Sequence, residues 1–202
     1  MGPAPPHRRD LFAFGRSDRW GLALLVGLVG VVTVVVQVVQ PAARWVGGDP
    51  MPVGYAGRVR VPALDALGVR HEDGSVTALV PDPGTTVRVV DLLLGLALSA
   101  AVLGARWLVL RGMRDVAAGD PFRPVNVTRL RVLAGLVAIA LPAVWFGRAS
   151  VDAAALTRLG PDLVVLVLVL PWVPVLAGTV VALLAEAFKL GGRLRDDVAG
   201  LV

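Results

Sequence analysis

The sequence predicts an all-α membrane protein: four transmembrane helices, with a small extracytoplasmic β-rich loop between the first and the second. Hydrophobic residues make up 56% of the chain and charged residues 17%, whereas about a quarter of the residues in a soluble domain are charged. Four apolar runs, 20–39, 92–110, 132–147 and 163–185, approach or reach the length of about 20 residues with which a helix crosses about 30 Å of hydrocarbon. Because the runs are continuous rather than alternating, they exclude a closed barrel of strands.

The first predicted helix spans 20–39 and follows a tail, 1–19, that carries four arginines. Secretory signal peptides also combine a basic tail with an apolar run. However, the run of about 20 residues exceeds the roughly 7 to 15 of a signal peptide, and the following "VVQPAARWV" has no convincing A-x-A cleavage site. We therefore expect the first helix to remain in the protein as a span.

The segment 40–90 is predicted to form a loop with short strands. Three stretches have strand-like patterns: "GRVRVPAL" from Gly57, "SVTALV" from Ser75 and "TTVRVV" from Thr85. The sequence "EDGS" at 72–75 supplies an Asp-Gly turn of the kind that closes tight hairpins. Because chains below about 40 to 60 residues rarely fold alone, we expect a flap of two or three strands that leans on the helices.

The second predicted helix spans 91–118 and extends past the membrane, with Gly119 as its C-cap glycine. A turnaround follows at 119–129. There Pro124 suits the first position of the next helix, because its missing N–H is not needed at that position. Arg123 occupies the preceding N-cap position, which small polar residues fill best, so we expect a weak cap.

The second half of the predicted bundle contains two further helices and their flanking segments. They are the third helix at 130–147, a loop at 148–162, the fourth helix at 163–189 and a tail at 190–202.

Prolines and glycines are expected to shape these spans. Pro142, Pro171 and Pro174 lie in the third and fourth apolar runs, where proline removes a backbone hydrogen bond and kinks a helix. Gly191 and Gly192 together cost about 2 kcal/mol of helix propensity and predict a bend. The small residues that favour close helix packing are Gly27, Gly30, Ala100 and Gly104.

Lysine and arginine are unevenly distributed along the chain, and this orients the predicted bundle. Thirteen of the twenty lie in the N-terminal tail, between Arg106 and Arg131, and from Lys189 onward. The other seven lie in the loops on the opposite side. Because cytoplasmic loops carry an excess of these residues, we expect a multi-pass protein of the cell membrane with both termini and the turnaround in the cytoplasm.

The basic inner face is the predicted contact surface for anionic lipid or a protein partner, since each Lys or Arg near an anionic leaflet contributes on the order of 1 kcal/mol. Charged residues inside membranes are expensive and tend to pair. We therefore predict an intramembrane ion pair of Arg106 with Glu186. A snorkelling Arg106, and a Glu186 paired with Arg114, are alternatives. The residues of the basic face are Arg111, Arg114, Arg123, Arg129, Arg131, Arg193 and Arg195.

The sequence contains no constellation of catalytic or metal-binding residues. It has no cysteine, which excludes disulfides, Cys-based zinc sites, thiolate nucleophiles and iron–sulfur clusters. His7 and His71 stand alone, and there is no P-loop, Rossmann fingerprint or Gly-x-Ser-x-Gly elbow. The basic residues do not form a stripe with interleaved aromatics, so direct binding of nucleic acid is not expected. We therefore predict a protein that is not an enzyme and has no cofactor or metal.

Two stretches, "GDPFRPVNVTRLR" at 119–131 and "LLAEAFKLGGRLRDDVAGLV" at 183–202, resemble a family of bacterial membrane proteins known as domain of unknown function 2975. The likeness extends to four spans, a long first outer loop, a Gly-x-Pro-Phe turnaround and a Leu-Arg-acidic-acidic tail. The chain departs from the family at Val125, where members usually carry an acid, and at Arg123. The resemblance implies an inner-membrane protein without established activity, in some cases encoded beside a small helix-turn-helix regulator that would be its cytoplasmic partner.

Three functional hypotheses follow from the sequence. The preferred one is a regulatory or partner-binding membrane protein that acts through its basic cytoplasmic face, with a homo-oligomer as an open alternative. The second is a small transporter or channel subunit, based on the span prolines and Arg106. In the third, the outer loop senses an envelope ligand.

Overall fold

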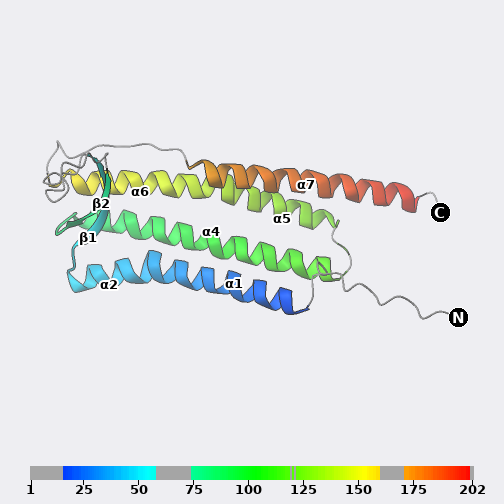
Figure 1. Cartoon of the computed structure of the whole chain (residues 1–202), viewed down its shortest axis with the longest axis horizontal. Helices are drawn as coiled ribbons and strands as arrows, with labels where there is room; N and C mark the ends of the chain where they lie inside the picture. The colour runs from blue at the N-terminus through cyan, green and yellow to red at the C-terminus, as the bar shows by residue number, and fades with distance from the viewer. Residues whose placement is uncertain (1–15, 58–73, 119, 121, 160–170, 201–202) are drawn as a thin grey trace, which may run out of the picture.

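The computed structural model describes residues 16–57, 74–118, 120, 122–159 and 171–200, which form four long helices and one two-stranded sheet (Figure 1). All four helices are long and apolar enough to cross a membrane, as the sequence predicts for a multi-pass membrane protein. The first helix is continuous through α1, η1 and α2, and the third through α5, η2 and α6. The bounds are α1 (Arg16–Val34), η1 (Val35–Val39), α2 (Gln40–Gly47), α4 (Thr85–Ala117), α5 (Pro124–Gly135), η2 (Leu136–Ala140), α6 (Leu141–Leu156) and α7 (Trp172–Ala199).

The helices extend beyond the predicted apolar spans. The second and third each have 33 residues, which at about 1.5 Å per residue exceeds the roughly 30 Å of hydrocarbon. The first helix, predicted to end at residue 39, continues to Gly47 and stops where Gly48 adopts a left-handed conformation with φ of 73°. There Asp49 N–H donates to the carbonyl of Arg44 over 2.9 Å, which satisfies one of the last free carbonyls. Apolar composition therefore marks the membrane-buried part of each helix rather than its ends.

The first and third helices each accommodate an internal proline through a π-helical turn that precedes it. A π-helical turn, η1 in one and η2 in the other, ends two residues before Pro41 and Pro142, respectively. Proline has no N–H with which to bond the carbonyl four residues earlier. In each helix the residue just before the proline donates instead to the carbonyl five residues back, so the helix continues through the proline.

The other two span prolines lie at the start of α7. Pro171 is the N-cap of α7 and Pro174 lies in its first turn, where a missing N–H leaves no helical carbonyl without a partner. Neither proline therefore breaks the hydrogen-bond ladder of α7. The helix begins at Trp172 rather than at residue 163, and residues 163–170 of the predicted span lie outside the described ranges.

A small antiparallel hairpin lies between the first two helices. Strand β1 (Met51–Gly57) pairs with β2 (Gly74–Val80), with Met51 opposite Val80. The strand predicted at 75–80 is confirmed. The stretch "GRVRVPAL" falls almost wholly in residues 58–73, outside the described ranges, as does the first half of the predicted turn at 72–75, whose Gly74 and Ser75 belong to β2.

The third predicted strand, 85–90, is wrong, because these residues form the first turns of α4. Asp82 orders the turn just before this start, since its carboxylate accepts a hydrogen bond of 3.0 Å from the N–H of Gly84, the N-cap residue of α4. Valine and threonine favour strands in water, but a helix that enters a membrane satisfies every backbone group internally. The β-propensity of "TTVRVV" was therefore misleading.

The most completely buried apolar cluster of the described residues joins the hairpin to α6. Val53 and Val80 are fully buried against Val151, Ala155 and Leu156. Burial of a valine or leucine side chain contributes about 1.5–3 kcal/mol. The hairpin is therefore firmly attached to the end of α6, and the predicted flap that leans on the helices is confirmed as two strands.

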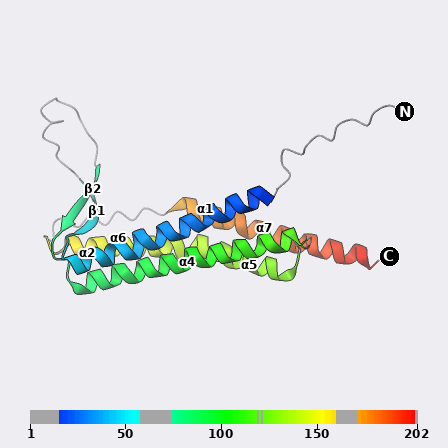
Figure 2. The same ribbon diagram turned by 90° about the horizontal axis from the view of Figure 1, so that it is seen from below.

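The hairpin lies at one end of the bundle, while the start of α1 and the end of α7 lie at the other (Figures 1 and 2). Helix α7 begins partway along the third helix and extends past the ends of α4 and α5 (Figure 1). We call the two ends the hairpin end and the arginine end. The arginine end carries Arg111, Arg114, Arg123, Arg129, Arg131, Arg193 and Arg195.

Candidate functional sites at the two ends of the bundle

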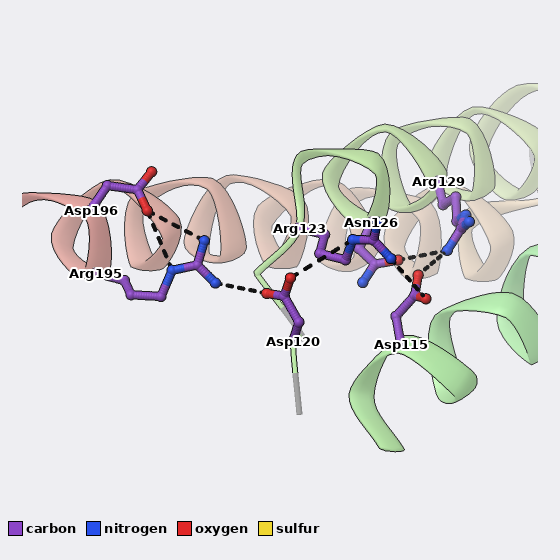
Figure 3. A network of polar contacts seen from close by, with 7 residues as sticks. All are labelled: Asp115, Asp120, Arg123, Asn126, Arg129, Arg195 and Asp196. Carbon is purple, nitrogen blue, oxygen red and sulfur yellow. Dashed lines mark hydrogen bonds and ion pairs between the residues drawn. The ribbon is translucent and has the colours of Figure 1, made fainter. Parts of the chain in front are cut away.

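The arginine end contains a network of ion pairs and hydrogen bonds (Figure 3). The network joins the last turn of α4, the connection that follows it, the first turns of α5 and the last turns of α7. It therefore links chain segments that are far apart in the sequence. Its members are Asp115, Asp120, Arg123, Asn126, Arg129, Arg195 and Asp196.

Arg129 and Asp115 form the most enclosed ion pair of this network. Their side chains are 16% and 18% exposed. The Arg129 guanidinium donates to the Asp115 carboxylate and, over 2.8 Å, to Oδ1 of the buried Asn126. Because both charges are largely removed from water, each depends on the other for compensation.

The remaining contacts of the network are more exposed. Arg123 lies between two carboxylates, with Nη1 3.6 Å from Asp115 and Nε 3.7 Å from Asp120. Asp120 also accepts a 2.7 Å hydrogen bond from Arg195 of α7. Exposed pairs of this kind contribute little individually, but this chain of contacts connects α7 to α4. As expected for Arg123 at the N-cap of α5, no side chain caps that helix.

Phe122 adds an apolar contact between the α4–α5 connection and α7. Its ring lies 5.5 Å from that of Phe188, centre to centre. A Cβ added at Gly191 would lie 2.7 Å from the Phe122 ring, so the glycine leaves the space that the ring occupies. Helix α7 continues through Gly191 and Gly192 to Ala199 and packs along α5, so the two glycines do not interrupt it.

Glu186 pairs with Arg131 of α5 and, over 3.3 Å, with Lys189 of its own helix. Arg106 lies on a different interface: its Nη2 would be 3.6 Å from a Cβ added at Gly27 of α1. The predicted Arg106–Glu186 ion pair is therefore replaced by an Arg131–Glu186 pair. Arg106 instead packs with Leu103 against the small-residue face of α1, which confirms close packing at Gly27 and Gly30.

The predicted basic face is thus divided into paired and unpaired arginines. Arg123, Arg129, Arg131 and Arg195 form ion pairs within the chain. The unpaired ones, as far as the described residues show, are the exposed Arg111, Arg114 and Arg193.

The unpaired arginines lie beside features suited to a membrane surface. The Arg111 guanidinium lies over the Trp107 ring, 5.1 Å from its centre. Arg193 lines a cavity of about 380 Å³ between α5 and α7, together with Arg131, Lys189 and Arg195.

A second cavity at this end, of about 210 Å³, has an almost wholly apolar lining from α4, α5 and α7, including Met113, Leu130 and Phe188.

The hairpin end contains a cavity of about 300 Å³ where the first three helices meet β1. Its walls are charged: the lining includes the cations Arg44, Arg88 and Arg148 and the carboxylates of Asp91 and Asp152. Two amides, Gln37 and Gln40, and the apolar side chains Trp45, Met51 and Leu92 complete much of the lining.

Arg148 is the least satisfied charged group of this cavity. Its side chain is 33% exposed, and Nη1 lies 3.8 Å from the Asp91 carboxylate, which is beyond hydrogen-bond distance. Nε and Nη2 are buried, and neither has a hydrogen-bond partner among the described residues. These two atoms form one edge of the guanidinium, and this edge commonly binds a carboxylate or phosphate with two parallel hydrogen bonds.

This cavity was not predicted from the sequence. Asp91 and Arg148 lie at the ends of apolar runs, where a charge normally marks a boundary with water. A usable signal was present in α6: Arg148 and Asp152 are four residues apart and therefore share one helix face. A polar face that continues an apolar span indicates a polar space between helices.

Within residues 16–57, 74–118, 122–159 and 171–200, no cluster of side chains suited to a metal ion is present. His7 and His71 lie outside the described residues. Comparison of the chain with protein-family models, with curated proteins and with solved structures finds no match.

Proposed function

We propose that this chain is a non-enzymatic integral protein of the bacterial cell membrane, whose arginine end faces the cytoplasm and binds anionic lipid and a cytoplasmic partner. The observation that carries the proposal is the division of the arginines. Four are held by ion pairs, whereas Arg111, Arg114 and Arg193 are exposed with no ion pair in the described part of the chain.

The paired arginines support this function indirectly. By fixing α4, α5 and α7 to one another, they hold the unpaired arginines in constant relative positions. A cation over a tryptophan ring, as for Arg111 and Trp107, suits the membrane interface, where amphipathic rings accumulate. The basic cavity between α5 and α7 is the kind of site in which lipid headgroups bind.

The resemblance to domain of unknown function 2975 supports a small helix-turn-helix regulator as the partner, held near the membrane by the same basic surface.

Removal of the three unpaired charges is expected to weaken binding of anionic lipid. At about 1 kcal/mol for each arginine near the surface, replacing Arg111, Arg114 and Arg193 together by glutamine corresponds to roughly a 100-fold loss. The measurement is the apparent affinity of the detergent-purified chain for short-chain phosphatidylglycerol at fixed salt.

The control removes a charge from the hairpin end instead, through Arg158→Gln, an exposed residue outside the lining of the cavity at that end. This variant should bind phosphatidylglycerol nearly as tightly as the unmodified chain. Equal losses in the two variants would show that net charge, rather than the arginine end, controls lipid binding and would remove the basis of the proposal.

The proposed orientation is tested with cysteines, since the chain has none of its own. Thr77 of β2 and Thr128 of α5 are exposed at opposite ends. In intact cells an impermeant maleimide should label Thr77→Cys but not Thr128→Cys, and both should react once the membrane is permeabilised. Labelling of Thr128→Cys alone would invert the orientation.

The alternative function, a small transporter or channel subunit, is supported by one observation, the charged cavity among the first three helices. Transporters place polar sites between helices whose regularity is interrupted. The π-helical turn η1 contributes Val36 and Gln37 to the cavity wall. This hypothesis requires that the chain transport a solute in proteoliposomes and that Arg148→Gln abolish this transport.

A further inference from the structure

We propose that the cavity at the hairpin end binds a small zwitterion, a molecule with a carboxylate or phosphate at one end and a primary amine at the other. Arg148 and Arg44 recognise the oxyanion, and Asp152 and Asp91 recognise the amine. This site is at the opposite end of the bundle from the surface assigned to lipid and partner binding, so it does not depend on that proposal.

Arg148 provides the first argument for a missing ligand group. A buried guanidinium edge without hydrogen bonds is costly, and most such groups in proteins have a partner. The edge formed by Nε and Nη2 packs against α4, with Nη2 3.6 Å from the position of a Cβ at Gly95. Because no hydrogen bond to a described residue holds the Arg148 side chain, the guanidinium can turn toward an oxyanion in the cavity without breaking one.

The other two arginines of the cavity have different roles. Arg88 is held in place, since its Nη2 donates to the carbonyl of Asp49 over 3.0 Å. The exposed side chain of Arg44 forms no ion pair within the described ranges. Arg44 is therefore available to share the oxyanion with Arg148, while Arg88 is held by its backbone contact.

The two aspartates argue for an amine in the same ligand. The carboxylate of Asp152 accepts a hydrogen bond from the backbone of Gly54, and that of Asp91 lies near one guanidinium nitrogen. Two carboxylates offer about eight acceptor positions, so several are unused. A simple anion would be repelled by these carboxylates and a simple cation by the three arginines, whereas a zwitterion is complementary to both.

The remaining lining determines the size of the ligand. A cavity of about 300 Å³ is at the lower limit of small-molecule sites, so a short linker must join the two charged groups. The attachment of β1 to α6 through Val53 makes one wall rigid. Both a free amino acid and the phosphoethanolamine headgroup of a lipid have this chemistry, and the experiment must distinguish them.

The test measures the thermal midpoint of the full chain, because a ligand that binds the folded state raises it. Glycine and phosphoethanolamine are the free probes, titrated into protein in phosphatidylcholine nanodiscs. Nanodiscs that contain phosphatidylethanolamine test the lipid source. Phosphocholine is the matched control, since its methyl groups remove every N–H that Asp152 and Asp91 would accept.

We expect a free probe or phosphatidylethanolamine to raise the midpoint, and phosphocholine to have no effect. Arg148→Lys keeps the charge but loses the two-donor edge, so it should weaken binding at least 10-fold, as should Arg44→Gln. Asp152→Asn should weaken binding of the amine-bearing probes. Arg158→Lys, a charge-conserving change outside the cavity lining, should bind like the unmodified chain.

Each contrary result overturns a part of the proposal. If neither free probe nor phosphatidylethanolamine stabilises the chain, the site does not exist. Equal stabilisation by phosphocholine removes the role of the aspartates. If Arg148→Lys fails to fold, Arg44→Gln, at an exposed position, becomes the test of oxyanion binding. Unchanged binding of the probes in that variant excludes the oxyanion site. Arg111→Gln at the arginine end should leave all of these values unchanged, which separates this test from that of the proposed function.

Discussion

Replacing Gly95 by alanine is expected to lower the free energy of unfolding by about 3 kcal/mol or more. A Cβ at this position would collide with the backbone carbonyl oxygen of Gln37 and lie 3.0 Å from its carbon. The obstacle is the main chain of η1, which no rotamer change can move. Helices α4 and η1 would have to separate, and the polar cavity that Gln37 lines would lose its wall.

Gly112→Ala is the matched control for this prediction, because Gly112 lies in the same helix and a Cβ there meets no described atom within 4 Å. That change should leave stability unchanged or raise it by about 0.5–1 kcal/mol. The measurement is unfolding of the detergent-purified chain by denaturant, followed by circular dichroism. Equal stability of the two variants would contradict the close approach of α4 to η1.

Gly178 has the equivalent position in the second half of the bundle. A Cβ there would lie 2.5 Å from that of Ala138 and 2.8 Å from the carbonyl oxygen of Ala134. Each proline-containing helix therefore packs its π-helical turn, or the residues beside it, against a glycine of the next helix. Composition indicated small-residue packing in general, but it could not show which glycines face a bulged backbone, because the π-helical turns have no simple sequence signature.

The extent of each helix was predictable only for its apolar part. Hydrophobicity locates the residues that lipid can surround, so all four spans were recognised. It does not distinguish a loop from a helix that continues into water, as α2 does beyond Pro41 and α6 does beyond Gly147. Capping and turn geometry decide those ends, and the left-handed Gly48 is an example that is evident only from the backbone.

The basic end was predicted from the number of arginines, but their partners were not. The acids that pair with Arg129, Arg131 and Arg195 lie 14, 55 and 75 residues away in the chain. Such pairings depend on which helices are neighbours and on their relative rotation. The predicted pairing of Glu186 with Arg106 rested only on the similar depth of the two residues in the membrane. Because α7 packs on α5 rather than on α4 at this level, Arg131 is the residue within reach.

Replacing Arg129 by methionine is expected to destabilise the arginine end by about 2 kcal/mol, because removing one partner of a part-buried, hydrogen-bonded pair leaves the other charge poorly compensated. Methionine keeps most of the side-chain volume, so the loss reports the charge and the hydrogen bonds. Asp115 would retain only the 3.6 Å contact with Arg123, and the buried Asn126 would lose the donor to its Oδ1. Denaturant unfolding in detergent measures the change.

The energetic importance of burial is tested by two comparisons. Arg195→Met breaks a pair whose side chains are 49% and 43% exposed, so it should cost much less than Arg129→Met. Combining Arg129→Met with Asp115→Leu removes both part-buried charges, and the double variant should be more stable than the sum of the single changes implies. If Arg195→Met were as destabilising as Arg129→Met, or if the two changes were additive, burial would not be what makes the Arg129–Asp115 pair important. The stability of this end would then come from apolar contacts such as that of Phe122 with Phe188, and the unpaired arginines would not depend on the network for their positions.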